Sequence, residues 1–180
     1  MTDRPPFSLR LATEADIPAM MPIMDRAIRD LLKPFLPPEA VAASFEIMGI
    51  DRQLVADGTY YVAEDDTGIL GCGGWSRRRT LYGGDHTAGR DAALLDPATE
   101  AARIRAMYTD PTAARRGIGR AILKACEDAA AREGFTRLEL MSTLAGEPLY
   151  SACGYAIAEA TSATTSAGVV IPLYRMTRTL

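Results

Sequence analysis

Hydrophobic residues recur along this chain with the spacing of a β-strand in some segments and the spacing of an α-helix in others. This pattern predicts the first elements. Residues 8–12 alternate in polarity like a short strand, and residues 13–16 match a capping box that opens a helix. Apolar residues then recur at helical spacing over 17–31, where Pro22 should kink the helix or shift its start. After a Pro-rich break, the pattern predicts a second helix over about 39–48.

The rest of the chain switches repeatedly between strand and helix periods. The predicted elements are a β-hairpin over 59–64 and 69–75, a strand over 102–109, a helix closed by Gly134, a strand over 137–141, a short helix over 147–153 and a last strand over 169–177. Pro172 suggests that the last strand is an edge or carries a bulge. This order predicts a mixed α/β fold with one sheet, and we expect one domain over residues 1–180.

Residues 76–100 lack a clear period. A connection this long is uncommon in a compact domain and is often functional. A mobile surface loop without a role is the equal alternative.

Composition supports a folded protein and excludes some classes of partner. Of the 180 residues, 48% are hydrophobic and 24% are charged, as in ordinary globular proteins. The net charge of -3 argues against a nucleic-acid partner, which usually requires a basic face. No apolar run approaches the roughly 18 residues that would span a bilayer, and the start lacks the apolar core of a signal peptide. We therefore expect a cytoplasmic protein without a membrane partner.

The residues that usually hold metals are few. Cys72, Cys126 and Cys153 are odd in number and widely spaced, which predicts buried free thiols rather than disulfides or a metal knuckle. His86 is the single histidine of the chain, so a multi-histidine metal site is impossible. We expect no metal.

The segment 114–120, Ala-Arg-Arg-Gly-Ile-Gly-Arg, carries the clearest chemistry. It follows a predicted strand and opens an amphipathic helix, whose first turn exposes unpaired N–H groups and the positive end of its dipole. Such a turn binds anions such as pyrophosphate, and neighbouring arginines add charge-assisted contacts. The spacing fits neither a Walker A loop nor a G-x-G-x-x-G fingerprint. Taken by itself, the segment also fits a tight turn without a ligand.

This segment resembles the acetyl-CoA-binding motif of the GNAT superfamily of N-acetyltransferases, Gln/Arg-x-x-Gly-x-Gly/Ala. The other matching segments, in the family's order, are 9–13 with Asp16, 61–64 with Gly71, 104–111, and Leu-Tyr-Ser-Ala-Cys-Gly-Tyr at 149–155. The resemblance implies a single mixed, mostly antiparallel sheet that is splayed at its centre and has helices on both faces. It also implies an enzyme that moves the acetyl group of acetyl-CoA to an amine of a small molecule or peptide by direct attack on the thioester.

The resemblance assigns roles to particular residues. The backbone of Met107 and Thr109 would pair with the pantetheine arm, the backbone amides of 116–120 would hold the pyrophosphate, and Tyr150 would protonate the departing thiolate. Two departures stand out, since Ala114 and Ala145 replace cofactor-contacting polar residues that many relatives carry. The predicted cofactor-binding residues are Met107, Tyr108, Thr109, Arg115, Arg116, Gly117, Ile118, Gly119 and Arg120.

The group that takes the amine proton stays open. An amine with a pKa near 10 is mostly protonated at neutral pH, so the proton must leave before or during attack. Glu100, Asp85, His86, Asp91 or a water relay are the candidates, and Glu100 and His86 enter the predicted catalytic set beside Tyr150.

Further interpretations follow from the sequence. A non-catalytic acyl-CoA sensor is the main alternative function, and a longer acyl-CoA or an alcohol acceptor is another. The run 77–79 of three arginines either attracts an acidic substrate or is simply solvated. Dimerisation through residues 169–180 is an analogy with the family.

Overall fold

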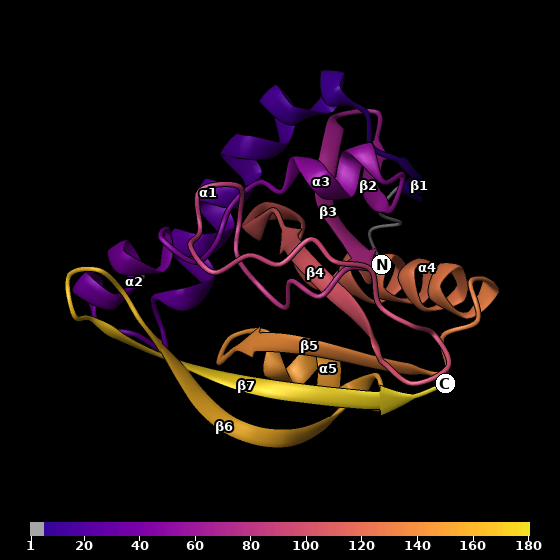
Figure 1. Ribbon diagram of the computed structural model, residues 1–180. Helices are drawn as coiled ribbons and strands as arrows, with labels where there is room; N and C mark the ends of the chain where they lie inside the picture. Colours follow the sequence, from indigo (N-terminus) through magenta and orange to yellow (C-terminus); the bar gives the residue numbers. More distant parts are fainter. Residues whose placement is uncertain (1–5) are drawn as a thin grey trace.

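The computed structural model describes residues 6–180 and places them in one seven-stranded sheet with helices on both faces (Figure 1). The strands are β1 (Ser8–Leu11), β2 (Tyr60–Asp65), β3 (Gly68–Ser76), β4 (Ala102–Thr109), β5 (Arg137–Thr143), β6 (Ala156–Thr164) and β7 (Val170–Thr179). The helices are α1 (Ile17–Leu32), α2 (Pro38–Ser44), α3 (Arg52–Ala56), α4 (Ile118–Arg132) and α5 (Glu147–Ala152). The strand order is β1-β2-β3-β4-β5-β7-β6, and every pair is antiparallel except β4 with β5. The predicted fold class is confirmed.

Two hydrophobic cores fill the two faces of the sheet. Helices α1, α2 and α3 pack on one face, where the apolar stripe of α1 buries Met20, Met24 and Ile28. Helices α4 and α5 pack on the other face, where Ile118, Ile122 and other apolar residues of α4 meet Trp75 and Leu138. Most of the apolar positions predicted for α1 and α4 are therefore buried, but Met21 and Leu31 of α1 are exposed.

The sheet opens between its two parallel strands. β4 and β5 pair only at Ala102 with Leu138 and Arg103 with Glu139, and the strands then diverge (Figure 1). The remaining part of β4 keeps its pairing with β3 but has no strand on its β5 side. This opening between two wings of the sheet creates the space for a site.

A β-bulge reshapes β4 at this opening. Cys72 pairs with Tyr108 and Gly74 with Arg105, so two residues of β4 lie opposite one residue of β3. Ala106 lies in the bulge with a φ of 50°, and its carbonyl accepts a hydrogen bond from the Tyr60 hydroxyl at 2.8 Å. A bulge bends its strand and increases the local twist, which accounts for the divergence of β4 from β5.

Several predicted boundaries differ from the structure. The second predicted helix is shorter, since α2 ends at Ser44 and single turns follow. Helix α3 and strand β6 have no counterpart among the predicted elements, because α3 is too short to show a period and β6 is largely exposed. β7 lies between β5 and β6, but Pro172 stands just beyond the last residue that pairs with β5, so this end of β7 has a neighbour on one side only.

The three cysteines are free thiols. Cys72 and Cys126 are buried as predicted, while Cys153 is half-buried. Burial raises the pKa of the Cys72 thiol to about 12, so this group stays protonated at neutral pH. Within residues 6–180, no helix has both the length and the apolar character that crossing a membrane requires.

Candidate functional site

Two cavities lie in the opening between β4 and β5. The first, about 110 Å³ in volume, lies between β4, β5 and residues 81–83 and is called the loop-side cavity. The second, about 160 Å³, lies between β4, α1 and α5 and is called the helix-side cavity. The residues that line both are Met48, Met107, Tyr108, Thr143, Gly146 and Tyr150. The two cavities are therefore neighbours that share the wall formed by these residues.

Tyr150 belongs to this shared wall. It lies on α5 with 8% of its surface exposed, and its ring packs edge-on against Tyr155 with the centroids 5.9 Å apart. Burial raises the pKa of the Tyr150 hydroxyl well above its usual value near 10, so the group stays protonated over the whole neutral range. Tyr150 lines both cavities, so a protonated hydroxyl on this residue is a candidate proton donor for a group bound there.

Met107 and Tyr108 complete the wall from the β4 side. Gly73 of β3 allows Met107 to lie where it does, because a Cβ at Gly73 would come within 2.1 Å of the Met107 sulfur. The hydroxyl of Tyr108 accepts a hydrogen bond from the backbone N–H of Gly49 at 2.9 Å, which ties β4 to the chain after α2. Of the predicted cofactor-binding residues, Thr109 and Gly119 line the helix-side cavity together with these two.

The predicted anion-binding turn has the required backbone form. Gly117 is the N-cap of α4 with a φ of 84°, Arg115 has a φ of 66°, and no side chain within residues 6–180 caps the helix. The first N–H groups of α4 therefore remain available to a ligand. The Arg116 guanidinium contacts Asp65 at 2.9 Å and holds this turn against the β2–β3 hairpin, while Arg115 and Arg120 are exposed.

The structure does not bring the proposed bases to the cavities. Glu100 accepts the backbone N–H of Asp96 at 2.8 Å, and the Nε2 of the exposed His86 lies 2.6 Å from the Phe45 carbonyl oxygen. Asp85 pairs with Arg52. Among the residues of the described chain that line either cavity, none is Asp, Glu or His. No cluster of three or more His, Cys, Asp or Glu side chains within residues 6–180 could hold a metal ion.

The long connection is folded back on itself and fixed to the sheet. Its two arms exchange backbone hydrogen bonds, including Arg79 N–H to the Ala93 carbonyl at 2.9 Å. Leu81, Tyr82 and Gly83 of this connection form one wall of the loop-side cavity. The segment thus has a structural role at the candidate site, which favours the functional interpretation over a loop without a role.

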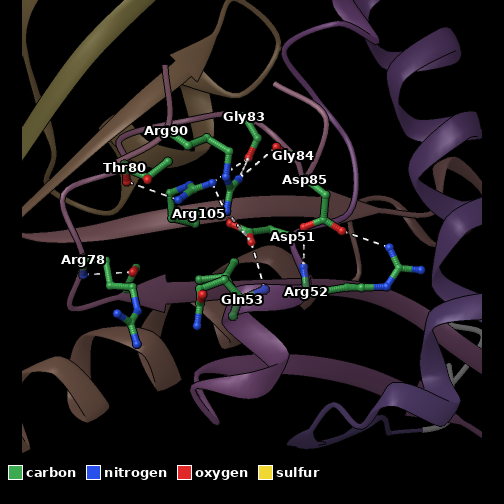
Figure 2. Close-up of polar contacts among 12 residues, drawn as sticks. Asp51, Arg52, Gln53, Arg78, Thr80, Gly83, Gly84, Asp85, Arg90 and Arg105 are labelled. Carbon is green, nitrogen blue, oxygen red and sulfur yellow. Dashed lines mark hydrogen bonds and ion pairs between the residues drawn. The ribbon is translucent and has the colours of Figure 1, made fainter. Parts of the chain in front are cut away.

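A buried charged cluster anchors the connection (Figure 2). Asp51, 1% exposed, accepts from Arg105 of β4 at 2.8 Å and from Arg90 of the connection at 2.9 Å. Arg105 also donates to the carbonyls of Thr80 and Gly83, and Arg90 donates to that of Gly84. These residues were not among the sequence-based candidates, although a charged residue inside the apolar run of β4 is a signal that could have indicated Arg105.

The arginine run is structural. Arg77 pairs with Glu133 at 2.6 Å, Arg78 with Asp57 at 2.7 Å, and Arg79 lies 3.7 Å from Glu100. Arg77 and Arg78 fix the start of the connection to the ends of α4 and α3. The sequence suggested that these arginines either attract an acidic substrate or are solvated. Instead, the ion pairs of Arg77 and Arg78 hold the chain in place.

Comparisons with known proteins agree with this geometry. A GCN5-related N-acetyltransferase from Rhodopseudomonas palustris superposes with a TM-score of 0.70 at 18% identity, covering 96% of this chain and 95% of that one. A PaiA N-acetyltransferase from Thermoplasma acidophilum, solved with coenzyme A, gives 0.65 at 11% identity, with 97% and 99% covered. The putative acetyltransferase YncA from Salmonella typhimurium, solved with acetyl-CoA, gives 0.64 at 17% identity, with 98% and 95% covered. These likenesses show a shared fold.

The sequence comparison is more specific than the fold. No curated protein sequence matches the chain at a significant level. A family model described as acetyltransferase (GNAT) family matches residues 25–155, which include β4, the α4 turn and Tyr150. The chain therefore belongs to the GNAT family of acetyltransferases.

Proposed function

We propose that this protein is an acetyl-CoA-dependent N-acetyltransferase that works as one domain, with the acyl donor in the helix-side cavity and the acceptor amine in the loop-side cavity. The observation that carries the proposal is the position of Tyr150, which lines both cavities. The two solved relatives that contain coenzyme A or acetyl-CoA support this choice of donor.

The residues present fit the donor. The uncapped first turn of α4 presents N–H groups suited to a pyrophosphate. The unpaired side of β4 from Met107 to Thr109 can pair with an extended arm as one strand pairs with another. Gly119 of the α4 turn and Tyr150 both line the helix-side cavity, so one cavity contacts the proposed pyrophosphate turn and the proposed acid. Acetyl-CoA would supply the activated acetyl group beside Tyr150.

The transfer itself makes one bond and breaks one. The amine nitrogen attacks the thioester carbonyl, the new N–C bond forms, and the C–S bond breaks. Tyr150 donates its hydroxyl proton to the departing sulfur, and the proton of the amine leaves through water in the loop-side cavity. Water takes this role in the proposal because the residues described at both cavities offer no carboxylate or imidazole.

The direct test combines binding and turnover. Isothermal titration with acetyl-CoA should show one site per chain, and a thiol-release assay across small amines, amino acids and peptides should show turnover with at least one acceptor. Binding of acetyl-CoA without turnover of any acceptor would favour the alternative function, a non-catalytic acyl-CoA sensor. A lack of acetyl-CoA binding would contradict both functions.

The charges beside the α4 turn give a prediction for affinity. Arg115→Ala and Arg120→Ala should each raise the dissociation constant of acetyl-CoA roughly fivefold, because each removes a cation beside the proposed pyrophosphate. Arg132→Ala makes the same charge change at the opposite end of α4 and serves as the matched control. Titration at two salt concentrations should show that the effect shrinks as salt screens the charges. If all three variants lose the same affinity for acetyl-CoA, the α4 turn is not the pyrophosphate site.

A second prediction concerns pH. With water as the proton acceptor, kcat/KM for an amine of pKa near 10 should rise about tenfold per pH unit below that pKa. Tyr150 does not limit the rise below pH 10, because burial raises its pKa and the acid form persists. Rates measured from pH 6 to 9 should give this slope, and Glu100→Gln and His86→Asn should leave it unchanged. A pH profile that instead levels off, and that regains its slope in His86→Asn, would make His86 the base.

A further inference from the structure

The wall of the loop-side cavity carries an unusual charge. Its lining combines apolar side chains, among them Ile47, Leu81, Met141 and Leu173, with polar groups such as Ser142 and Thr143. Among the described residues that line it, Arg105 alone is charged at neutral pH. Arg105 is only 3% exposed, so this is a buried cation beside a cavity of mixed polarity.

Arg105 is not fully neutralised by its own partners. Arg105 and Arg90 share the single carboxylate of Asp51, which leaves one positive charge in excess within the cluster (Figure 2). The other acceptors of the two guanidinium groups are the neutral carbonyls of Thr80, Gly83 and Gly84. The nearby Asp85 pairs with Arg52 instead. Buried charges are stable when paired, so the excess charge favours an anionic group on a ligand.

The guanidinium also has donors to spare. Arginine carries five N–H groups, and three of those on Arg105 donate to Asp51, Thr80 and Gly83. Its Nε–H donates to no residue in the described part of the chain. Every fully buried side-chain nitrogen within residues 6–180 has a partner, so Nε is an atom that solvent reaches. A planar guanidinium with a spare donor and a net positive neighbourhood suits a carboxylate.

We propose that the acceptor is a small amino acid-like compound, with an amine, a carboxylate and an apolar body, and that Arg105 binds its carboxylate in the loop-side cavity. This rests on the proposed N-acetyltransferase function. The apolar side chains in the lining accommodate the body of the compound, and Tyr150 lines the same cavity as Arg105, so the amine can be presented at the acyl end of the donor. A polyamine is disfavoured, because the lining described here offers it no carboxylate and places a cation beside it.

The test uses sets of acceptors that keep the same apolar body and change the carboxylate. Leucine, leucinamide and isoamylamine form one set, and phenylalanine, phenylalaninamide and phenethylamine form another. In the thiol-release assay, with kcat/KM expressed per concentration of unprotonated amine, the acid of each set should be at least tenfold above its amide and amine. In calorimetry against the protein saturated with CoA, the acids should bind at least tenfold more tightly than the amides, a readout that needs no turnover.

Two variants assign the effect to Arg105. Arg105→Gln should lower the acid-to-amide ratio at least tenfold, since it removes the proposed partner but leaves Arg90 to pair with Asp51. Arg90→Gln is the comparison variant, because it removes the excess positive charge but keeps the Arg105 guanidinium at the loop-side cavity, and it should lower the ratio less than Arg105→Gln does. Both variants should keep the wild-type affinity for acetyl-CoA, which reports that they are folded.

The outcomes test the carboxylate inference separately from the N-acetyltransferase proposal. Amides or simple amines that bind and react as well as the acids would overturn the carboxylate inference and leave the N-acetyltransferase proposal standing. Acids that fail to bind the CoA-saturated protein more tightly than their amides would overturn it even without turnover. Absence of acetyl-CoA binding would instead overturn the proposed function.

Discussion

Replacing Tyr150 with phenylalanine should lower kcat by about 100- to 10,000-fold, the usual contribution of a positioned general acid. The change removes one oxygen and leaves the ring, so the edge-on packing against Tyr155 at 5.9 Å is retained. The hydroxyl of Tyr150 donates to no residue within 6–180, so its loss breaks no hydrogen bond that stabilises the fold. We therefore expect unchanged acetyl-CoA affinity and a free energy of unfolding within about 0.5 kcal/mol of wild type.

Tyr155→Phe provides the matched control. Its hydroxyl bonds to the buried carboxylate of Glu127 at 3.2 Å, and its side chain lines neither cavity. This variant should lose about 1 kcal/mol of stability and keep its kcat. Thiol-release kinetics and thermal unfolding of both variants give the four values needed. A Tyr150→Phe protein with wild-type kcat would contradict the assignment of Tyr150 as the acid.

Replacing Asp51 with asparagine should lower the free energy of unfolding by about 3–5 kcal/mol. Asparagine has nearly the same shape and can still accept the Gln53 N–H that caps α3, so the change removes mainly the negative charge. Arg105 and Arg90 would then face each other in a buried site without a carboxylate. For a chain of 180 residues this corresponds to a loss on the order of 10 °C in melting temperature.

Two comparisons make this prediction decisive. Asp85→Asn removes a carboxylate that pairs with Arg52 near the surface, and it should cost less than about 1 kcal/mol. Adding Arg90→Gln to Asp51→Asn should restore part of the stability, because it removes one of the two unpaired cations. Denaturant unfolding of the three variants measures these differences. A loss below 1 kcal/mol for Asp51→Asn, or no recovery in the double variant, would contradict the account of this cluster.

The α4 turn shows what a local pattern can predict. Glycines at 117 and 119, arginines beside them and an apolar stripe behind them follow from short-range rules about helix starts, and the structure has this turn with an uncapped first turn of α4. The pattern also predicts the long helices α1 and α4, because each turn of a long helix adds another apolar residue at the same spacing. Short elements such as α3 carry too few repeats to be identified.

The arrangement of side chains around the two cavities does not follow from short-range sequence rules. Ala106 has a φ of 50°, but the residues next to it in the sequence do not indicate a bulge. The bulge arises from a register shift between β3 and β4. The partnership of Arg105 with Asp51 joins residues 54 positions apart, and it depends on where the long connection returns to the sheet. Glu100 and His86 were chosen for their chemistry, and their hydrogen bonds to Asp96 and Phe45 follow from the same tertiary packing.

The sequence by itself therefore determined the family resemblance, the mixed sheet and the proposed cofactor turn, because these depend on residues that are neighbours in the chain. Tertiary structure alone decided which side chains meet at the two cavities, that Tyr150 lies at both, and that a buried cation lines the loop-side cavity. The physical reason is that pairing register, burial and charge compensation are properties of contacts between distant segments, which no local period encodes.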